Sequence, residues 1–342
     1  MKKILLVILI IALCAVSAFA CSGKTDETRV VIAFPTGGPA LALSYLIKEC
    51  PTEIDGAKVT YRAVQGDAGI KSAFMNLTDT VDVAIMPTNV AAQLYNGGMD
   101  IKLVATNSYG LLYMISDEFT DESFSIEAFK GHVLHAVGKA GTPGIVLKKI
   151  FGDSYVESKT AVDGKIAVVY HSDGSEIISA IKQGDIHNAV LGEPAVTSAM
   201  ANTSMKIVLD LQEAWKSATG SENSYPQTCL VVKGDFLKKN VKLVQTIAKY
   251  TLYGSIELEK DAAPMIETLK SIQAAYPASQ KSIERANIAP KFGTSAKADV
   301  EDFFTILKEI NPDAIGGVLP DAGFYYIDSA FETDMNVIRA FA

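Results

Sequence analysis

Short apolar runs alternate with amphipathic stretches along most of the chain, beginning at Arg29. The runs are four to seven residues long and rich in β-branched residues, and the stretches between them repeat apolar positions with helical spacing. Such runs predict buried strands, and strands that alternate with helices predict an α/β fold with mostly parallel sheets flanked by helices. The first series predicts strands at 29–34, 58–64, 81–86 and 101–106, with one helix ending at 49 and others at 68–77 and 87–95.

A second series of the same kind begins near Gly131. Two serial α/β units of about 100 residues each predict two similar lobes rather than one core. The connections at 111–115 and 227–233 are candidate strands that cross between the lobes. Beyond Asp235 the pattern becomes mostly helical. The second series predicts strands at 132–137, 165–170, 187–191 and 206–209, and helices are predicted at 143–150, 175–182, 194–201, 241–259, 262–275 and 297–310.

Glycine, proline and polar residues recur where predicted strands give way to helices. In an open α/β sheet, ligands lie outside the carboxyl ends of the strands, where helix starts offer free N–H donors. Every α/β protein also needs turns, which these residue types supply, so each junction alone is open to both interpretations. Their recurrence in both series predicts a shared cleft. The junctions are Gly37-Gly38-Pro39, Gln65-Gly66-Asp67, Met86-Pro87-Thr88-Asn89, Gly141-Thr142-Pro143-Gly144, Asp173-Gly174-Ser175 and Gly192-Glu193-Pro194.

The N-terminus indicates the compartment. Lys2 and Lys3 precede thirteen uninterrupted apolar residues, fewer than the roughly 20 that a membrane-spanning helix needs, so residues 1–20 are predicted to be a signal peptide. The small residues before Cys21 resemble a bacterial lipobox, with Ala18 in place of the usual leucine. We therefore predict lipidation of Cys21, a tether at 21–28 and an extracytoplasmic, membrane-anchored protein; an unmodified secreted start is the alternative.

Charge and cysteine content narrow the class of protein. The formal net charge is −8, and removing residues 1–20 with their two lysines would make it −10. No basic cluster is present, which argues against a nucleic-acid partner. Cys50 and Cys229 lie too far apart in sequence to indicate whether they pair, and both resemble ordinary small apolar residues.

Over residues 29–330, the chain resembles the NitT/TauT-type substrate-binding lipoproteins of ABC importers, which have a type II periplasmic-binding-protein fold. This resemblance implies lobe one at 29–112 and 233–342, lobe two at 113–232, and closure of the lobes around a solute. It also implies a monomer that delivers the solute to an ABC permease and its ATPase, without a cofactor. The segments that carry it are Ala84-Ile85-Met86-Pro87-Thr88-Asn89-Val90-Ala91-Ala92, Asn107-Ser108-Tyr109-Gly110, Gly141-Thr142-Pro143-Gly144, Gly192-Glu193-Pro194-Ala195, Gly316-Gly317-Val318-Leu319-Pro320-Asp321 and Phe324-Tyr325-Tyr326.

The resemblance also implies which residues contact the solute. Asparagine and glutamine can each read a donor or an acceptor, whereas Thr142 can donate to a carboxylate or ring oxygen. Glu193 either faces a cationic solute or is a helix-start acid stabilised by the dipole. No arginine falls in these loops, which favours a neutral or cationic organic solute over a sulfonate or nitrate. The predicted ligand-binding residues are Gly38, Gln65, Thr88, Asn89 and Asn107 of lobe one, Thr142, Asp173 and Glu193 of lobe two, and Gln227 near the hinge.

Several aromatic residues and histidines have two interpretations. The aromatic residues can stack on a planar heterocycle or belong to the core and rim. His132 and His135 are three apart on a predicted strand, so they point to opposite faces and cannot chelate one metal. His171 can line the cleft or lie in a solvated turn, and His187 is read as structural. The aromatic candidates are Tyr61, Tyr95, Tyr109, Tyr170 and Trp215.

The sequence contains no metal-binding cysteine–histidine spacing, phosphate loop, nucleophile elbow or dinucleotide fingerprint. We therefore predict a binding protein with no catalytic residues and no metal. One alternative is a surface lipoprotein that senses a solute or contacts a partner. A second is an enzyme, because the fold resembles that of dehydratases in menaquinone biosynthesis, with Glu193 or Asp173 as the acting carboxylate.

Overall fold

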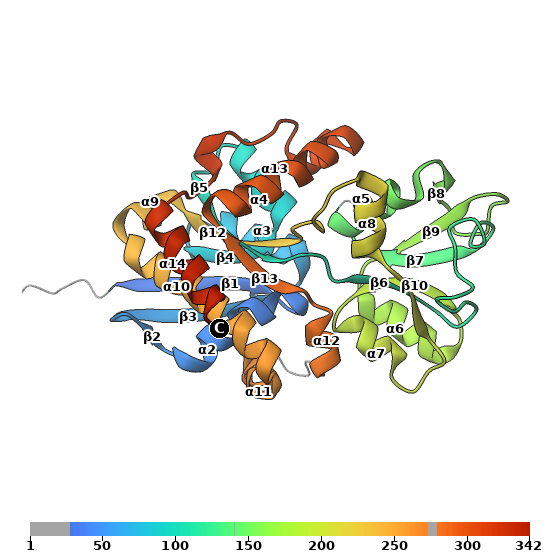
Figure 1. Cartoon of the computed structure of the whole chain (residues 1–342), viewed down its shortest axis with the longest axis horizontal. Coiled ribbons are helices and arrows are strands. Elements are labelled where there is room, and N and C mark those ends of the chain that lie inside the picture. Colours follow the sequence, from blue (N-terminus) through green and yellow to red (C-terminus); the bar gives the residue numbers. More distant parts are fainter. Residues whose placement is uncertain (1–27, 140, 273–278) are drawn as a thin grey trace, which may run out of the picture.

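A computed structural model describes residues 28–139, 141–272 and 279–342. The predicted signal peptide and Cys21 lie outside the described residues. Two sheets flanked by helices form two lobes that lie side by side (Figure 1), so the predicted two-lobed α/β fold is confirmed. Among the described residues, no helix is both long and apolar enough to cross a membrane.

The larger lobe is built on a seven-stranded sheet in the order β13-β5-β12-β4-β1-β3-β2. In this sheet, β1 runs parallel to β3 and β4, whereas β12 runs antiparallel to β4 and β5. Its strands are β1 (Arg29–Pro35), β2 (Glu53–Ile54), β3 (Ala57–Val64), β4 (Val83–Pro87), β5 (Ile101–Ser108), β12 (Thr228–Lys233) and β13 (Ile288–Phe292).

Helices cover both faces of this sheet because its central strands are apolar on both sides. All five residues of β4 are buried. Val83 and Ile85 pack in one core cluster, and Ala84 and Met86 in another, as the alternation of side chains along a strand requires. The helices of this lobe are η1 (Gly38–Leu43), α2 (Ser44–Glu49), α3 (Gly66–Met75), α4 (Thr88–Asn96), α9 (Gly234–Lys239), α10 (Val241–Lys260), α11 (Ala263–Ile272), α12 (Gln280–Glu284), α13 (Gly293–Ile310), η3 (Pro312–Ile315), η4 (Ala322–Phe324) and α14 (Ser329–Ala340).

The smaller lobe is built on a six-stranded sheet in the order β11-β6-β10-β7-β9-β8. Here β7 runs parallel to β9 and β10, whereas β6 runs antiparallel to β10 and β11. Its strands are β6 (Leu112–Ser116), β7 (Val133–Val137), β8 (Tyr155–Glu157), β9 (Ile166–His171), β10 (Asn188–Gly192) and β11 (Lys206–Asp210). Its helices are α5 (Thr142–Phe151), η2 (Gly152–Ser154), α6 (Gly174–Gln183), α7 (Ala195–Met200) and α8 (Leu211–Thr219).

Both sheets are mixed, with a parallel part in each. The parallel pairing expected from the alternating strands and helices occurs among β1, β3 and β4, and again among β7, β9 and β10. Of the antiparallel strands, β6 and β12 are those that the chain enters directly after it crosses between lobes, whereas β2 and β13 lie at the edges of the larger sheet. A crossing strand enters its sheet at the end that faces the other lobe, so it runs antiparallel to its neighbours. An alternating pattern cannot reveal this insertion.

The chain crosses between the sheets twice, once between β5 and β6 and once between α8 and β12. The first crossing includes Gly110, whose φ is +70°, and a Cβ there would lie 2.6 Å from the Gln212 side chain. Gln212 Nε2 donates to the Leu112 carbonyl over 3.1 Å, and its Oε1 accepts from the Leu112 N–H over 3.0 Å. This pair of hydrogen bonds holds the start of β6 against α8.

Several helices and strands were not predicted from the sequence. Strand β13 contains Pro290 and lies at the edge of its sheet, where a missing N–H is tolerated. Helix α8 and the C-terminal α14 were also unpredicted. Most predicted strands and helices are present, with ends that differ by a few residues.

Cys50 and Cys229 are both free, which answers the question that the sequence left open. Cys229 is fully buried in β12, and this burial raises the pKa of its thiol to about 12. Cys50 is half-buried at the end of α2. Both therefore act as small packing residues, as expected from the sequence.

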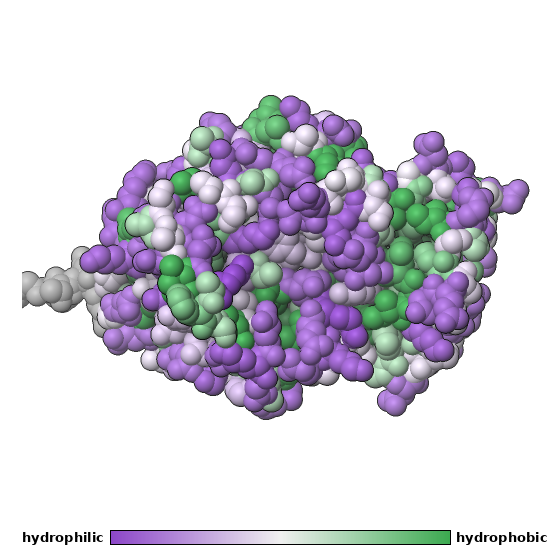
Figure 2. Space-filling model, in the orientation of Figure 1, coloured by the Kyte–Doolittle hydropathy of each residue, from purple (hydrophilic) through white to green (hydrophobic). Residues whose placement is uncertain are grey.

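Figure 2 shows a mostly hydrophilic surface on this face, with apolar residues gathered in separate patches. One patch lies over α14 near the C-terminus, where Val337 and Phe341 are exposed. A hydrophilic surface is consistent with the net negative charge of the chain.

Candidate functional site

Three backbone segments meet at one end of the central strands of the larger sheet. The ends of β4 and β5 lie on either side of the start of β12. The Thr88 N–H donates to the Gln227 carbonyl over 3.1 Å, and the Gln227 N–H donates to the Ser108 carbonyl over 2.8 Å. These two hydrogen bonds bring three predicted site residues, Thr88, Asn107 and Gln227, to neighbouring positions at this end of the strands.

Most polar side-chain atoms of these residues lack partners among the described residues. Thr88 and Asn107 are fully buried, and neither polar atom of the Asn107 amide has a hydrogen-bond partner. Thr88 Oγ1 has no partner other than the thiol of Cys229, which bonds weakly. Gln227 is half-buried, and its Oε1 is buried without a partner. We call Thr88, Asn107 and Gln227 the polar cluster. Buried polar atoms are rarely unpaired in folded proteins, and each unpaired atom costs about 1–3 kcal/mol, so the polar cluster is a candidate binding site.

Two helix starts from the two lobes face each other nearby. Thr142, the first residue of α5, donates from Oγ1 to Oδ1 of Asn89, the second residue of α4, over 3.4 Å. Thr142 and Asn89 are at most 2% exposed. Neither helix has a side-chain cap. The starts of two helices thus supply N–H groups and positive dipole ends at the interface between lobes.

Gly144 allows the start of α5 to form. A Cβ at this position would lie 2.1 Å from the main-chain oxygen of Lys139, a contact that only backbone movement could relieve. Gly144 is therefore required for the close approach of helix and loop that positions Thr142.

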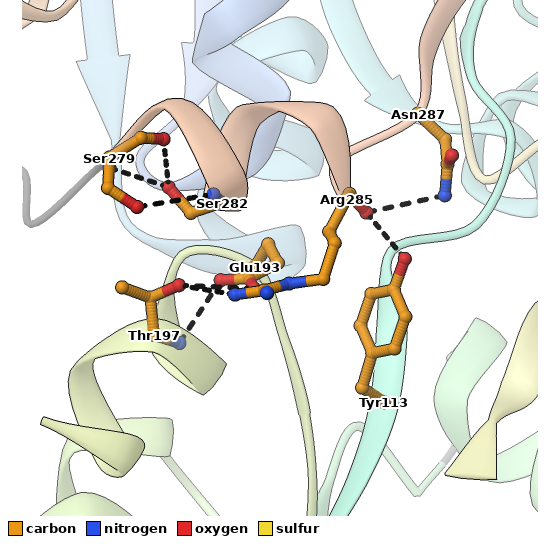
Figure 3. A network of polar contacts seen from close by, with 7 residues as sticks. All are labelled: Tyr113, Glu193, Thr197, Ser279, Ser282, Arg285 and Asn287. Atoms are coloured by element: carbon orange, nitrogen blue, oxygen red, sulfur yellow. Dashed lines mark hydrogen bonds and ion pairs between the residues drawn. The ribbon is translucent and has the colours of Figure 1, made fainter. Parts of the chain in front are cut away.

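Glu193 binds to an arginine of the other lobe. Its Oε1 accepts from Arg285 Nε over 2.5 Å, and Oε2 accepts from the Thr197 N–H over 3.1 Å at the start of α7 (Figure 3). Of the two interpretations of Glu193, the structure supports the helix-start acid. The carboxylate is not free for a cationic solute, because Arg285 neutralises it.

The other predicted site residues lie apart from the polar cluster. Gln65 is exposed, and its Oε1 accepts from Thr36 Oγ1 over 3.4 Å. Asp173 is exposed and caps α6 by accepting from the Ser175 N–H over 2.6 Å. Hydrogen bonding to the Ser175 side chain, and then to its N–H, lowers the pKa of the Asp173 carboxyl. Gly38 faces the other lobe, and a Cβ there would lie 2.8 Å from the Glu193 carbonyl oxygen. None of these three residues supplies one of the buried unpaired side-chain atoms found among the described residues.

The aromatic candidates have structural partners, which favours the core-and-rim interpretation. Tyr109 donates its hydroxyl to Asp299 Oδ2 over 2.6 Å, and burial raises the pKa of that hydroxyl. Trp215 is 1% exposed and packs against Tyr225 and Phe303 with ring centroids 5.4 and 5.7 Å away. Partners of the other three are the Cys50 carbonyl for Tyr61, Asp321 for Tyr95 and Tyr155 for Tyr170.

The histidines also have local contacts, although the buried Nδ1 of His132 has no hydrogen-bond partner among the described residues. His132 stacks on Phe129, whereas His135 lies 2.8 Å from His171 between Nδ1 and Nε2, so the two do lie in separate environments as predicted. Burial, with a smaller effect from His171, lowers the pKa of His135 to about 4. His187 contacts Asp117 over 3.0 Å. Within the described part of the chain, no three histidine, cysteine or acidic residues are placed to hold a metal ion.

A surface pocket of about 340 Å³ opens beside the hinge. It is lined by residues of both lobes, including Asp210, Glu213, Glu259 and Glu284, and by none of the nine predicted site residues. Ser224 Oγ, which lines this pocket, is buried without a hydrogen-bond partner among the described residues, but it is a single such atom beside several carboxylates. The polar cluster has more unpaired atoms and consists of predicted site residues, so it is the stronger candidate site.

Comparison with known proteins finds no matching family model and no matching curated protein. Among solved structures, an ABC transporter protein from Parabacteroides distasonis is similar with a TM-score of 0.72 and 25% identity, covering 89% of this chain and 100% of that chain. The periplasmic aliphatic sulphonate-binding protein SsuA from Escherichia coli has a TM-score of 0.62 and 13% identity, covering 83% of this chain and 94% of that chain.

This chain has the fold of the ABC-transporter substrate-binding proteins. The resemblance found in its sequence is thereby confirmed. The same fold also carries the desulfinase DSZB, solved with biphenyl-2-sulfinic acid, at a TM-score of 0.60 and 11% identity over 91% of this chain and 99% of that chain. The fold alone therefore does not separate binding from catalysis.

Sequence reasoning missed Arg285. It lies 92 positions from Glu193, directly after the short helix α12 and far outside the predicted loops, and no local pattern links the two. Thr197, which contacts both, was likewise missed, although its place four residues after Glu193 on a predicted helix was a usable signal.

Proposed function

We propose that this protein is an extracytoplasmic solute-binding lipoprotein that delivers a small organic solute to an ABC importer by closure of its two lobes. The observation that carries the proposal is the polar cluster, in which the amide of fully buried Asn107 has two polar atoms without a hydrogen-bond partner among the described residues. Binding proteins of ABC importers with the same fold support the transport role. The proposed lobes are 29–112 with 233–342, and 113–232, and Thr88, Asn89, Asn107, Thr142 and Gln227 are the proposed solute contacts.

Catalysis fits these residues less well. The two carboxylates that a dehydratase-like reaction would use are Asp173 and Glu193. Asp173 is an exposed helix cap, and Glu193 is ion-paired with Arg285. A general acid or base must be free to exchange a proton with a bound molecule, and neither group is placed to do so.

The proposed solute is a small neutral molecule with both hydrogen-bond donors and acceptors, such as an amide or a heterocycle. Asn107 offers one donor group and one acceptor, Thr88 offers a hydroxyl, and Gln227 offers an acceptor. The side chains of the polar cluster carry no charge, and the nearby Glu193–Arg285 pair cancels its own. The helix starts at Thr88 and Thr142 favour an electronegative solute atom between them.

A thermal-stability screen of residues 22–342 against small metabolites tests this function. The panel holds neutral heterocycles and amides, amines, amino acids, sulfonates and nitrate. A ligand at 100 times its dissociation constant should add about 2.7 kcal/mol to the free energy of unfolding. Stabilisation by neutral members supports the proposal. Stabilisation by sulfonates or amines alone would overturn the solute class, and a flat response from the whole panel would count against solute binding.

The lipid anchor is tested separately through Cys21, the proposed acceptor of the lipid. Cys21→Ser should move the protein from the membrane fraction to the soluble fraction almost completely, because a serine cannot receive a thioether-linked lipid. Cys50→Ser is the matched control and should leave the protein with the membranes, since Cys50 belongs to the folded lobe. Membrane retention of the Cys21→Ser protein would contradict the anchor.

A further inference from the structure

We propose that the arrangement of the lobes in this structure is the closed one, and that Glu193, Thr197 and Arg285 form an interlobe lock, which holds this arrangement and strengthens solute binding without touching the solute. The effect of the lock on lobe position does not depend on the proposed function. The effect on solute binding rests on the proposed function.

The lock contains a fully bonded carboxylate. Arg285 donates from Nε to Glu193 Oε1 over 2.5 Å and from its terminal nitrogen to Thr197 Oγ1 over 2.8 Å. The Thr197 hydroxyl donates in turn to Glu193 Oε1 over 3.2 Å, and the Thr197 N–H donates to Oε2 over 3.1 Å. The Glu193 side chain is 0% exposed and that of Arg285 is 25% exposed. Such a charge-assisted network has strict geometric requirements.

The two halves of the lock belong to different lobes. Glu193 lies between β10 and α7 of the smaller lobe and Thr197 lies in the first turn of α7. Arg285 directly follows α12, before the edge strand β13 of the larger lobe. Figure 3 shows Arg285 reaching from the end of α12 toward the start of α7. An opening movement of the lobes must separate these groups.

The main chain at Arg285 is also hydrogen-bonded to the smaller lobe. Tyr113, on β6, donates its hydroxyl to the Arg285 carbonyl over 3.0 Å. Asn287 donates from Nδ2 to the same carbonyl over 3.3 Å and to the Gly110 carbonyl of the first crossing segment over 3.1 Å. On the other side, the Glu193 carbonyl packs on Gly38. The lock therefore lies directly beside the hinge and defines one relative position of the lobes.

The energetic role of the lock follows from burial. A buried ion pair gains little over an apolar pair of the same size, because both charges lose water. Loss of one partner is different, because the remaining charge stays buried in the closed form but can regain water in the open form. Removing Arg285 alone should thus oppose closure strongly, whereas removing both charges should oppose it much less.

The test compares Arg285→Met with the double variant Glu193→Met/Arg285→Met. The interlobe distance is measured without solute by fluorescence transfer between dyes at Lys159→Cys and Lys239→Cys, in a Cys50→Ser background. Both labelled positions are exposed. Arg285→Met should lengthen the mean distance, and the double variant should return most of the way to the unsubstituted distance. An unchanged distance in Arg285→Met would overturn the lock.

Solute affinity is the second readout, measured with whichever panel member stabilises the protein. Arg285→Met should weaken binding about 100-fold, mainly through faster dissociation, because the binding-competent closed form becomes rare. The double variant should recover to within about 10-fold of the unsubstituted protein. A lengthened distance with unchanged affinity would overturn the role in binding. If no panel member stabilises the protein, the result counts against the proposed function, and the distance test remains valid.

Two controls separate the lock from general damage. Arg62 pairs with Asp79 over 2.7 Å on the surface of one lobe, with the Asp79 side chain 69% exposed, so Arg62→Met should change neither readout. If Arg285→Met does not fold, Thr197→Val gives a milder test, since it keeps the size of the side chain and removes the hydroxyl that bridges the pair. It should shift both readouts in the same direction, with affinity falling by about 10-fold. No shift in a folded Thr197→Val protein would overturn the network.

Discussion

Replacing Asn107 by leucine should weaken solute binding by at least about 30-fold while leaving the free protein as stable as before or more stable. Asn107 is fully buried, and both polar atoms of its amide lack partners among the described residues. Leucine has a similar shape and no polar atoms to desolvate. The substitution therefore removes an unfavourable burial from the free protein and removes two hydrogen bonds from the complex.

The measurements are urea unfolding of the free protein and the dissociation constant of the stabilising solute. Asn188→Leu is the matched control, because Asn188 is also buried but its amide bonds Ser116 over 2.7 Å and Glu118 over 2.6 Å. It should destabilise the protein, since its polar partners would be left unpaired. Undiminished binding by Asn107→Leu, or a large loss of stability, would contradict the assignment of Asn107 to the solute site.

Replacing Trp215 by alanine should lower the free energy of unfolding by about 3–5 kcal/mol. Trp215 lies on α8, next to the second crossing segment, and packs against Tyr225 and Phe303. Phe303 lies on α13 of the larger lobe, so this aromatic cluster joins the lobes beside the hinge. Alanine would leave a cavity between rigid elements that cannot easily collapse.

The loss is measured by urea unfolding followed by circular dichroism, because Trp215 is the only tryptophan of the chain and its fluorescence would vanish with it. Trp215→Phe is the control and should lose less than half as much stability as the alanine variant, since phenylalanine fills most of the space that the tryptophan occupied. A loss below about 1 kcal/mol for the alanine variant would show that the cluster contributes little.

Local patterns in the sequence predicted most of the architecture. The apolar run of β4 and the polar residues at its end indicated both a central strand and a functional junction, and the structure has a fully buried strand followed by Thr88 and Asn89. Burial and helical spacing act within a few residues, so they leave a trace in any short window of sequence. The resemblance to substrate-binding proteins follows from the same segments.

Contacts between distant segments were not visible in the same way. Asp173 and Gln65 have the same position after a strand as Thr88, yet they are exposed, because the alternating pattern does not show which junctions the other lobe covers. The partner of Glu193 was hidden for a related reason. Its distance to Arg285 depends on how two lobes pack, and no local propensity encodes that packing.

The sequence by itself determined the two α/β units, the buried strands and the helix starts that carry Thr88, Asn89 and Thr142. The order of strands, with β6 and β12 inserted antiparallel, was decided only in the tertiary structure, as was the neutralisation of Glu193 by Arg285. The physical reason is that strands and helices arise from short-range sterics and hydrogen bonding, whereas ion pairs and unpaired buried atoms depend on which surfaces, distant in sequence, exclude water together.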